Sequence, residues 1–269
     1  MGQYANLGML IARTDPSAPK HQGISYFAFP MLQDGVEVRP LREMTGRSIF
    51  NEVFIDEARV PHANVIGELH GGWRVANTTL MVERSGIGGG AGGVSAATPG
   101  PLAGHLGRPA GDFLGVRPAL AVGGVGYRTW ELLIDLAGQA GKRDDPMVRQ
   151  ELAALHTAIE MGRWAGQRAK AGGAHTGGEG NLAKIAITNT IHQARHLGNA
   201  VLGAGATLDG DGAPSGGVIQ ELTTFSPAPS IYGGTDEVQR NIIGERVLGL
   251  PKEPGTDRDT PFRELPPNR

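Results

Sequence analysis

The chain has 269 residues, 39% of them hydrophobic and 5% aromatic, and a formal net charge of −2, which predicts a globular protein with one large or two smaller domains. It has no dense Lys/Arg cluster and no cysteine, so we exclude nucleic acid as a partner, exclude disulfides and thiolate metal sites, and expect a reducing cytoplasm. No run reaches the ~18 apolar residues of a membrane span, and the N-terminal stretch lacks the basic region of a signal peptide, so we expect a soluble protein.

The first part of the chain is typical of β-structure. Four extended segments, at 8–12, 24–29, 36–39 and 49–55, contain β-branched and aromatic residues. The sequence Gln33-Asp-Gly35 between the second and third segments indicates a tight turn. We therefore predict about four strands and assign residues 1–68 to a partial antiparallel β domain.

Helical periodicity begins after Gly71-Gly72. Trp73, Ala76, Leu80 and Glu83 follow one another at helical spacing, which predicts that Glu83 lies on the apolar face of this helix. Three more apolar stripes follow and need one another as covering neighbours, so residues 69–251 are predicted to form an all-α, up-and-down helical bundle. The stripes are Trp130, Leu133, Ile134 and Ala137; Val148, Leu152, Leu155 and Ile159; and Ile187, Ile191, Ala194, Leu197 and Val201.

The bundle is predicted to be interrupted once and to end at Pro251. Residues 86–128 are rich in Gly, Ala and Pro, which indicates a flexible insertion. The last helix begins near Thr235-Asp-Glu237, where a hydroxyl cap and two acids match the positive end of the helix dipole, and its apolar positions are Val238, Ile242 and Val247. The polar, proline-rich tail, 252–269, is predicted to be disordered.

Six motifs in register resemble the acyl-CoA dehydrogenase family, specifically its C-terminal portion. The last of them alone is specific, and together they extend over roughly residues 4 to 251. They are Ala12-Arg-Thr-Asp-Pro, Lys20-His-Gln-Gly-Ile-Ser-Tyr-Phe, Phe54-Ile-Asp-Glu-Ala-Arg-Val-Pro, Gly71-Gly-Trp, Glu83-Arg84, and Ile231-Tyr-Gly-Gly-Thr-Asp-Glu-Val-Gln-Arg-Asn-Ile-Ile-Gly-Glu-Arg-Val-Leu-Gly-Leu-Pro251.

The resemblance implies an N-terminal helical domain, a middle β domain and a C-terminal bundle. Here the first is missing and the second is half present, so much of the flavin and acyl pocket is absent. Either a second polypeptide supplies these parts or the reading frame is truncated, and we favour truncation. The fold class expected is α+β.

The family removes the α proton of an acyl-CoA thioester while the β hydride passes to flavin adenine dinucleotide (FAD), so it needs one positioned carboxylate as base. Many members carry that base in a Tyr-Glu-Gly-Thr motif, but this chain has Tyr232-Gly-Gly-Thr235. Other members place the base on the first bundle helix before an Arg, which Glu83-Arg84 matches. We predict Glu83 as the catalytic base; the alternative is a Glu83 ion pair with an Arg on another helix.

The resemblance also implies cofactor and substrate residues. Gly203 and Gly205 would lie near the flavin pyrophosphate, although a plain helix-ending turn also explains them. Arg143 would reach the diphosphate of a neighbouring subunit, or else be a solvated loop charge. Thr235 and Glu237 would contact the adenosine end, or serve only as helix cap and first-turn acid. The substrate residues implied are Tyr232, Gly234 and Arg84; Tyr232 is alternatively a core side chain.

The implied partners are acyl-CoA as substrate, an electron-transfer flavoprotein as electron acceptor, and further subunits in a homo- or hetero-tetramer built as a dimer of dimers. His192 and His196 are spaced to chelate a metal, but position 193 is Gln and no third ligand is nearby in sequence, so no metal is expected.

Two other functions remain open. A non-catalytic subunit that assembles with an active chain would explain Gly233 and the missing half. A flavin monooxygenase or nitroalkane oxidase on the same fold is not excluded by fold alone, although Glu83 argues against it.

Overall fold

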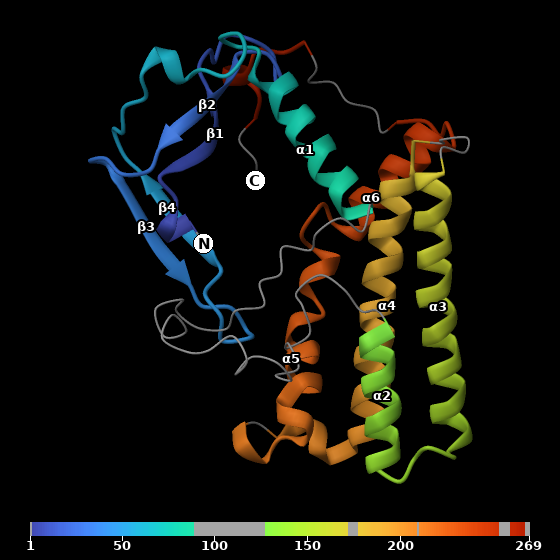
Figure 1. Ribbon diagram of the computed structural model, residues 1–269. Helices are drawn as coiled ribbons and strands as arrows, with labels where there is room; N and C mark the ends of the chain where they lie inside the picture. The colour runs from blue at the N-terminus through green and yellow to red at the C-terminus, as the bar shows by residue number, and fades with distance from the viewer. Residues whose placement is uncertain (1, 89–126, 172–176, 209, 253–258, 267–269) are drawn as a thin grey trace. The chain divides into compact units, whose positions relative to one another are not determined.

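A computed structural model describes residues 2–88, 127–171, 177–208, 210–252 and 259–266. The chain divides into two compact units: a β unit, Met1–Glu83 with Pro251–Arg269, and a helical unit, Arg84–Leu250 (Figure 1). The predicted α+β class is confirmed. The unit boundary lies within helix α1 (Gly72–Gly88), later than the boundary at 68/69 expected from the sequence.

The described strands of the β unit form two antiparallel pairs. Strand β1 pairs with β2 from Leu7↔Pro30 to Arg13↔Ile24, and β3 pairs with β4 from Val36↔Ile55 to Leu41↔Phe50. Short 3-10 turns occupy Gly2–Tyr4 and His62–Asn64. The four strands are β1 (Leu7–Arg13), β2 (Ile24–Pro30), β3 (Val36–Leu41) and β4 (Phe50–Ile55), close to the extended segments predicted.

The two strands of the first pair differ in burial. Tyr26 and Phe29 of β2 are buried, whereas Leu7, Met9 and Ile11 of β1 are 62%, 74% and 47% exposed. Alternate side chains of a strand point to the same face, so these three residues form one apolar stripe. The β unit therefore leaves one face of β1 uncovered within the described chain.

Helix α1 is fixed to β2 by close backbone contact at its first residue. A Cβ atom at Gly72 would lie 2.4 Å from the backbone of Ser25 and Tyr26, so only glycine fits there. The hydroxyl of Ser25 accepts a hydrogen bond from the His70 backbone N–H at 2.8 Å and lies 2.7 Å from the Thr14 hydroxyl. These contacts determine where the helix starts.

Part of the tail is folded onto the β unit. The backbone N–H of Phe262, in the 3-10 turn Phe262–Glu264, donates to the Ala18 carbonyl at 3.0 Å. The guanidinium of Arg13 lies over the Phe262 ring, 3.9 Å from its centre. Disorder was expected here from composition, but residues 259–266 are folded against the β unit. The contact between Phe262 and the cationic side chain of Arg13 explains the difference.

Five described helices and several short turns build the helical unit (Figure 1). The last helix continues into a π-helical turn at Ile243–Val247. The helices are α2 (Tyr127–Gln139), α3 (Pro146–Lys170), α4 (Glu179–Leu202), α5 (Val218–Phe225) and α6 (Asp236–Ile242), with 3-10 turns at Gly203–Thr207, Gly210–Gly212, Pro214–Gly217 and Ala228–Ser230.

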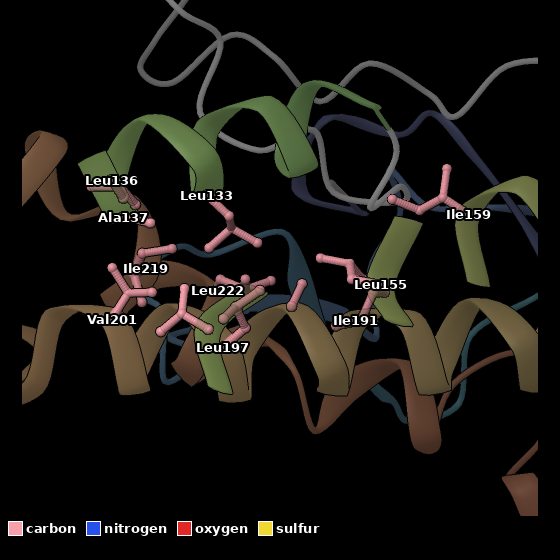
Figure 2. Packing of buried hydrophobic residues seen from close by; sticks show 12 residues of the cluster. Leu133, Leu136, Ala137, Leu155, Ile159, Ile191, Leu197, Val201, Ile219 and Leu222 are labelled. Carbon is pink, nitrogen blue, oxygen red and sulfur yellow. The ribbon is translucent and has the colours of Figure 1, made fainter. Parts of the chain in front are cut away.

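The core of this unit lies between α2, α3, α4 and α5, and in Figure 2 side chains of these helices point toward one another. Its members include most of the predicted stripe residues, and Trp130, Leu152 and Ile187 pack against it. The three predicted core helices are confirmed. The buried cluster is Leu133, Leu136, Ala137, Val148, Leu155, Ile159, Ile191, Ala194, Leu197, Val201, Ile219 and Leu222.

Helix α5 was not predicted from the sequence. It has eight residues, of which Ile219 and Leu222 are buried, and this is too short for a clear helical period. The predicted insertion, 86–128, lies outside the described residues except at its two ends, where α1 extends to Gly88 and α2 begins at Tyr127. Among the described helices, none is both long and apolar enough to cross a membrane.

Candidate active site

The Tyr232–Thr235 turn connects the Ala228–Ser230 turn to helix α6. Both of its glycines have left-handed backbone angles, φ +65° at Gly233 and φ +82° at Gly234. A Cβ at Gly234 would approach the Gln239 side-chain nitrogen to 2.8 Å. With glycine at 233, the turn itself contributes no carboxylate to proton transfer.

A buried amide, Gln239, holds this turn from inside the bundle. Gln239 is only 2% exposed. Its Nε2 donates to the Gly233 carbonyl oxygen at 2.6 Å, and its Oε1 accepts from Asn181 Nδ2 of α4 at 2.5 Å. The Asn181–Gln239–Gly233 relay, as we call it, links α4 to the turn through one side chain.

Thr235 and Glu237 occupy the first positions of α6. The Thr235 hydroxyl oxygen accepts from the Val238 N–H at 3.3 Å and caps the helix. A hydrogen bond from its own backbone N–H, and then one from the Thr235 hydroxyl, lowers the pKa of the Glu237 carboxyl. Thr235 is thus the helix cap and Glu237 a first-turn acid, which was the simpler interpretation of the sequence.

A second polar contact joins α4 to α6. Lys184 Nζ lies 2.7 Å from Asp236 Oδ1, and the two side chains are only 8% and 13% exposed. The ion pair places a carboxylate at the first position of α6, where the helix dipole favours negative charge. The relay and this ion pair together fix where α6 begins.

Tyr232 and His192 both lie close to the Ala228–Ser230 turn. Tyr232 is partly exposed, its ring centre is 6.4 Å from that of Phe225, and burial raises the pKa of its hydroxyl. His192 Nε2 lies 2.9 Å from the Ser230 hydroxyl, and burial lowers the pKa of this imidazole. Tyr232 is therefore neither a fully buried core residue nor a free surface one.

Helix α1 carries the predicted base, Glu83, followed by Arg84, whose side chains lie outside the described part. The stripe predicted to bury this face is wrong at two positions, because Trp73 and Leu80 are 38% and 40% exposed while Ala76 is buried. Within the β unit, α1 contacts β2 through Gly72 and through a 3.5 Å contact between the Tyr26 and Thr79 hydroxyls, and the Trp73 ring stacks on His21 with ring centres 4.4 Å apart. Position 83 follows Ala76 by seven residues and so repeats its face of the helix.

The predicted pyrophosphate residues lie together at the end of α4 that is remote from the Tyr232 turn. Gly203, with φ +55°, ends α4, so the helix-ending interpretation holds for it. Lys142 Nζ donates to the Ala200 carbonyl at 2.7 Å, which brings the loop of the exposed Arg143 to this end of the helix. Gln220 Nε2 donates to the Gly205 carbonyl at 2.9 Å, and its buried Oε1 has no hydrogen-bond partner among the described residues.

The predicted site residues of the helical unit thus form two groups. Tyr232, Gly234, Thr235 and Glu237 lie beside the start of α4, whereas Arg143, Gly203 and Gly205 lie at its end (Figure 1). Between Asn181 and Gly203 the helix rises about 33 Å at ~1.5 Å per residue. The groups are too far apart to form one compact pocket within one helical unit.

Within the described residues, His, Cys, Asp and Glu side chains form no group of three that could hold a metal ion. His192 contacts Ser230 instead, and His196, one turn later, is exposed.

The model of the acyl-CoA dehydrogenase C-terminal domain matches residues 113–248, which is more than half of the chain. The chain belongs to the acyl-CoA dehydrogenase family. The resemblance seen in the sequence motifs is thereby confirmed, and acyl-CoA dehydrogenases are oxidoreductases.

Two curated relatives of this family show how much of the fold is represented. Acyl-CoA dehydrogenase IpdE1 of Mycolicibacterium smegmatis is 35% identical over 254 residues, which are 94% of this chain and 56% of the relative. Acyl-CoA dehydrogenase FadE34 of Mycobacterium tuberculosis is 32% identical, over 92% of this chain and 29% of the relative. The chain thus spans about half the length of IpdE1.

Solved structures of acyl-CoA dehydrogenases agree with this extent. The Tcur3481-Tcur3483 steroid acyl-CoA dehydrogenase matches with a TM-score of 0.72 and 25% identity, over 94% of this chain and 58% of that one. The ChsE4-ChsE5 complex of Mycobacterium tuberculosis matches with a TM-score of 0.68 and 26% identity, over 93% and 59%. Both are complexes of two named proteins.

Sequence reasoning missed Gln239, Asn181 and Gln220. It placed Val238 on the buried face of α6, but Val238 is exposed and Gln239 is buried instead. Helical spacing is the sequence signal that could have found Gln239. This residue precedes Ile242, a predicted apolar position, by three residues and so lies on the same face of the helix. A polar residue at such a position predicts a buried partner only once the neighbouring helix is known.

Proposed function

We propose that this chain acts in the FAD-dependent α,β-dehydrogenation of an acyl-CoA thioester, with Glu83 as the base that removes the α proton. The observation that carries the proposal is the position of the candidate carboxylate. The turn has Gly233 where many family members have the catalytic Glu. Glu83-Arg84 lies on α1, where the other members have their base. A family that must abstract a proton needs one carboxylate, and Glu83 matches the second pattern.

The residues at the end of α4 fit a flavin nucleotide. Arg143 offers an exposed guanidinium suited to a diphosphate, and Gly203, where a Cβ would meet nothing within 4 Å, leaves the backbone open to a close ligand. Gln220 Oε1, which has no partner within the described part of the chain, is a buried acceptor that a hydroxyl or amino group of a nucleotide would satisfy. When bound, FAD supplies the acceptor for the β hydride.

We assign the roles of this chain's own residues from their match to the family's motifs. Glu83 takes the α proton and holds it on its carboxylate. Arg84, Tyr232 and Gly234 line the thioester side, and Thr235 and Glu237 contact the adenosine end of a flavin. Because the two flavin groups lie at opposite ends of α4, we assign them to different flavins in a homo- or hetero-tetramer, with an electron-transfer flavoprotein as electron acceptor.

The test measures acyl-CoA oxidation and flavin content in the assembled enzyme that contains this chain. We expect FAD-dependent formation of the 2,3-double bond, and we expect Glu83→Gln to reduce turnover about 10²–10⁴-fold, the usual contribution of a general base. The matched control is Glu68→Gln, the same chemical change at an exposed glutamate of the β unit. Wild-type turnover in Glu83→Gln would overturn the assignment.

The choice of substrates in this assay follows from the relatives. One similar structure is named a steroid acyl-CoA dehydrogenase, so the panel contains straight-chain, branched and steroid-bearing acyl-CoA thioesters. The ranking of kcat/KM among them assigns the acyl class.

A second candidate function is a subunit that assembles with an active acyl-CoA dehydrogenase chain. Gly233 favours it, as do the two-protein complexes among the similar structures. In that case the purified chain is colourless, gains flavin only with a partner, and leaves turnover of the complex unchanged when Glu83 is replaced.

A further inference from the structure

In the Gly233–Gly234 turn, two residues with unusual backbone freedom both adopt left-handed angles. Two successive glycines have many accessible backbone angles in the unfolded and in a loosened state. The relay restricts these angles, because the buried Gln239 Nε2 donates a hydrogen bond to the Gly233 carbonyl oxygen at 2.6 Å. In a trans peptide the next N–H points the opposite way, so the relay also sets the direction of the Gly234 N–H.

The orientation of the Gln239 amide is determined by its two partners. Asn181 Nδ2 is a donor, so the Gln239 atom facing it must be the acceptor Oε1. The Gly233 carbonyl is an acceptor, so it must face Nε2. A flipped amide would place two acceptors together and two donors together, and the burial of Gln239 and Asn181 makes the pair of facing donors costly.

We propose that Gln239 is a positioning residue of the candidate active site: through the Asn181–Gln239–Gly233 relay it holds the peptide between Gly233 and Gly234 in the orientation in which the turn meets the thioester. This inference rests on the proposed function. Gln239 acts through Gly233 and Gly234 and touches neither substrate nor base. We expect its removal to lower the rate of the chemical step more than the affinity for acyl-CoA, because a misoriented turn affects the reacting thioester rather than the whole substrate.

The main test uses Gln239→Met, which keeps the length and volume of the side chain but removes both hydrogen bonds. The control is Asn199→Leu, which breaks another amide contact of α4, the 2.9 Å bond from Asn199 Nδ2 to Thr223 Oγ1 on α5. We expect kcat of Gln239→Met to fall about tenfold or more with KM within about twofold, and kcat of Asn199→Leu to stay within about twofold. A kcat that follows the loss of thermal stability equally in both variants would overturn the proposal.

A length swap separates positioning from simple stabilisation. In the double variant Asn181→Gln/Gln239→Asn the amide-to-amide bond between the helices can re-form, but the shorter side chain at 239 no longer reaches the Gly233 carbonyl. We expect this variant to recover thermal stability relative to Gln239→Met but not kcat. Recovery of kcat together with stability would show that the relay only stabilises the bundle.

Hydrogen exchange distinguishes failure of this inference from failure of the proposed function. We expect backbone amides of residues 232–236 to exchange faster in Gln239→Met and in the length swap, and at the wild-type rate in Asn199→Leu. Unchanged exchange in Gln239→Met contradicts the inference even if the enzyme is an active dehydrogenase. A wild type without dehydrogenase activity overturns the proposed function, and with it the positioning of a thioester, while the exchange pattern still decides whether Gln239 holds the turn.

Discussion

The helical unit and the β unit differ in how far they bury their apolar and charged side chains. The helical unit buries a contiguous cluster of Leu, Ile, Val and Ala, together with a lysine–aspartate pair. The β unit buries Tyr26 and Phe29 but exposes the apolar stripe Leu7, Met9 and Ile11. A row of exposed large apolar residues contributes little to stability by itself. We infer that the bundle derives its stability from its own residues, whereas the described β strands do so only in part.

The largest expected effect contrasts two ion pairs. Lys184→Met should destabilise the helical unit by about 3–5 kcal/mol, because it leaves the Asp236 carboxyl, only 13% exposed, without its cation. Arg74→Met in the β unit breaks an exposed pair, Arg74–Glu68, separated by 3.8 Å, and should cost at most about 1 kcal/mol. Urea unfolding followed by circular dichroism measures both. The double variant Lys184→Met/Asp236→Leu should recover most of the loss, and an equal effect of the two single changes would erase the contrast.

Truncating one apolar side chain in each unit compares the stability contributions of a buried and an exposed apolar residue. Leu197→Ala removes a fully buried side chain of the core cluster and should cost about 2–5 kcal/mol. Met9→Ala shortens the most exposed residue of the β1 stripe and should change stability by less than about 0.5 kcal/mol. The same urea titration applies. A cost for Met9→Ala close to that of Leu197→Ala would mean that β1 is covered in solution.

A smaller effect is expected at the start of α6. Thr235→Ala removes the oxygen that accepts from the Val238 N–H and should cost about 1 kcal/mol. Thr235→Ser keeps the hydroxyl and should retain most of the stability. If the alanine and serine variants unfold at the same urea concentration, the cap contributes nothing.

The smallest effect is a pH dependence of the helical unit. Burial lowers the pKa of His192 below its ordinary value of 6.5; Arg195 also lowers it and Asp236 opposes the shift. The unfolded chain therefore binds this proton more readily, so the contribution to stability is complete above pH 6.5 and declines as the pH falls through the lowered pKa.

The measurement compares urea midpoints at pH about 7.5 and about 5.5. His192→Gln should reduce the difference between the two midpoints, and His196→Gln, at an exposed position, should leave it as in the wild type. A difference that His196→Gln changes and His192→Gln does not would contradict the assignment to His192.

The sequence predicted the helical unit better than the contacts around the candidate site. Periodic apolar residues on α2, α3 and α4 repeat over several turns, so Leu133, Leu155 and Leu197 were correctly placed in the core. The four strands were likewise found by their alternation and β-branched residues. Helix α5 was missed because eight residues give too short a period.

Side-chain contacts between distant segments were not accessible from the pattern. Asn181 and Gln239 are 58 positions apart, and nothing local indicates that their amides meet. Trp73 and Leu80 have helical spacing but remain exposed, because an apolar face is buried only where another element covers it. Phe262 was placed in a disordered tail because its docking on Arg13 depends on the folded β unit.

The most direct test of the central claim is exchange of the acyl-CoA α hydrogen with deuterated solvent, which reports the base without any electron acceptor. The assembled enzyme containing this chain should exchange the α hydrogen, and Glu83→Gln should slow that exchange about 10²–10⁴-fold while Glu68→Gln leaves it unchanged. Exchange at the wild-type rate in Glu83→Gln would show that another group removes the proton.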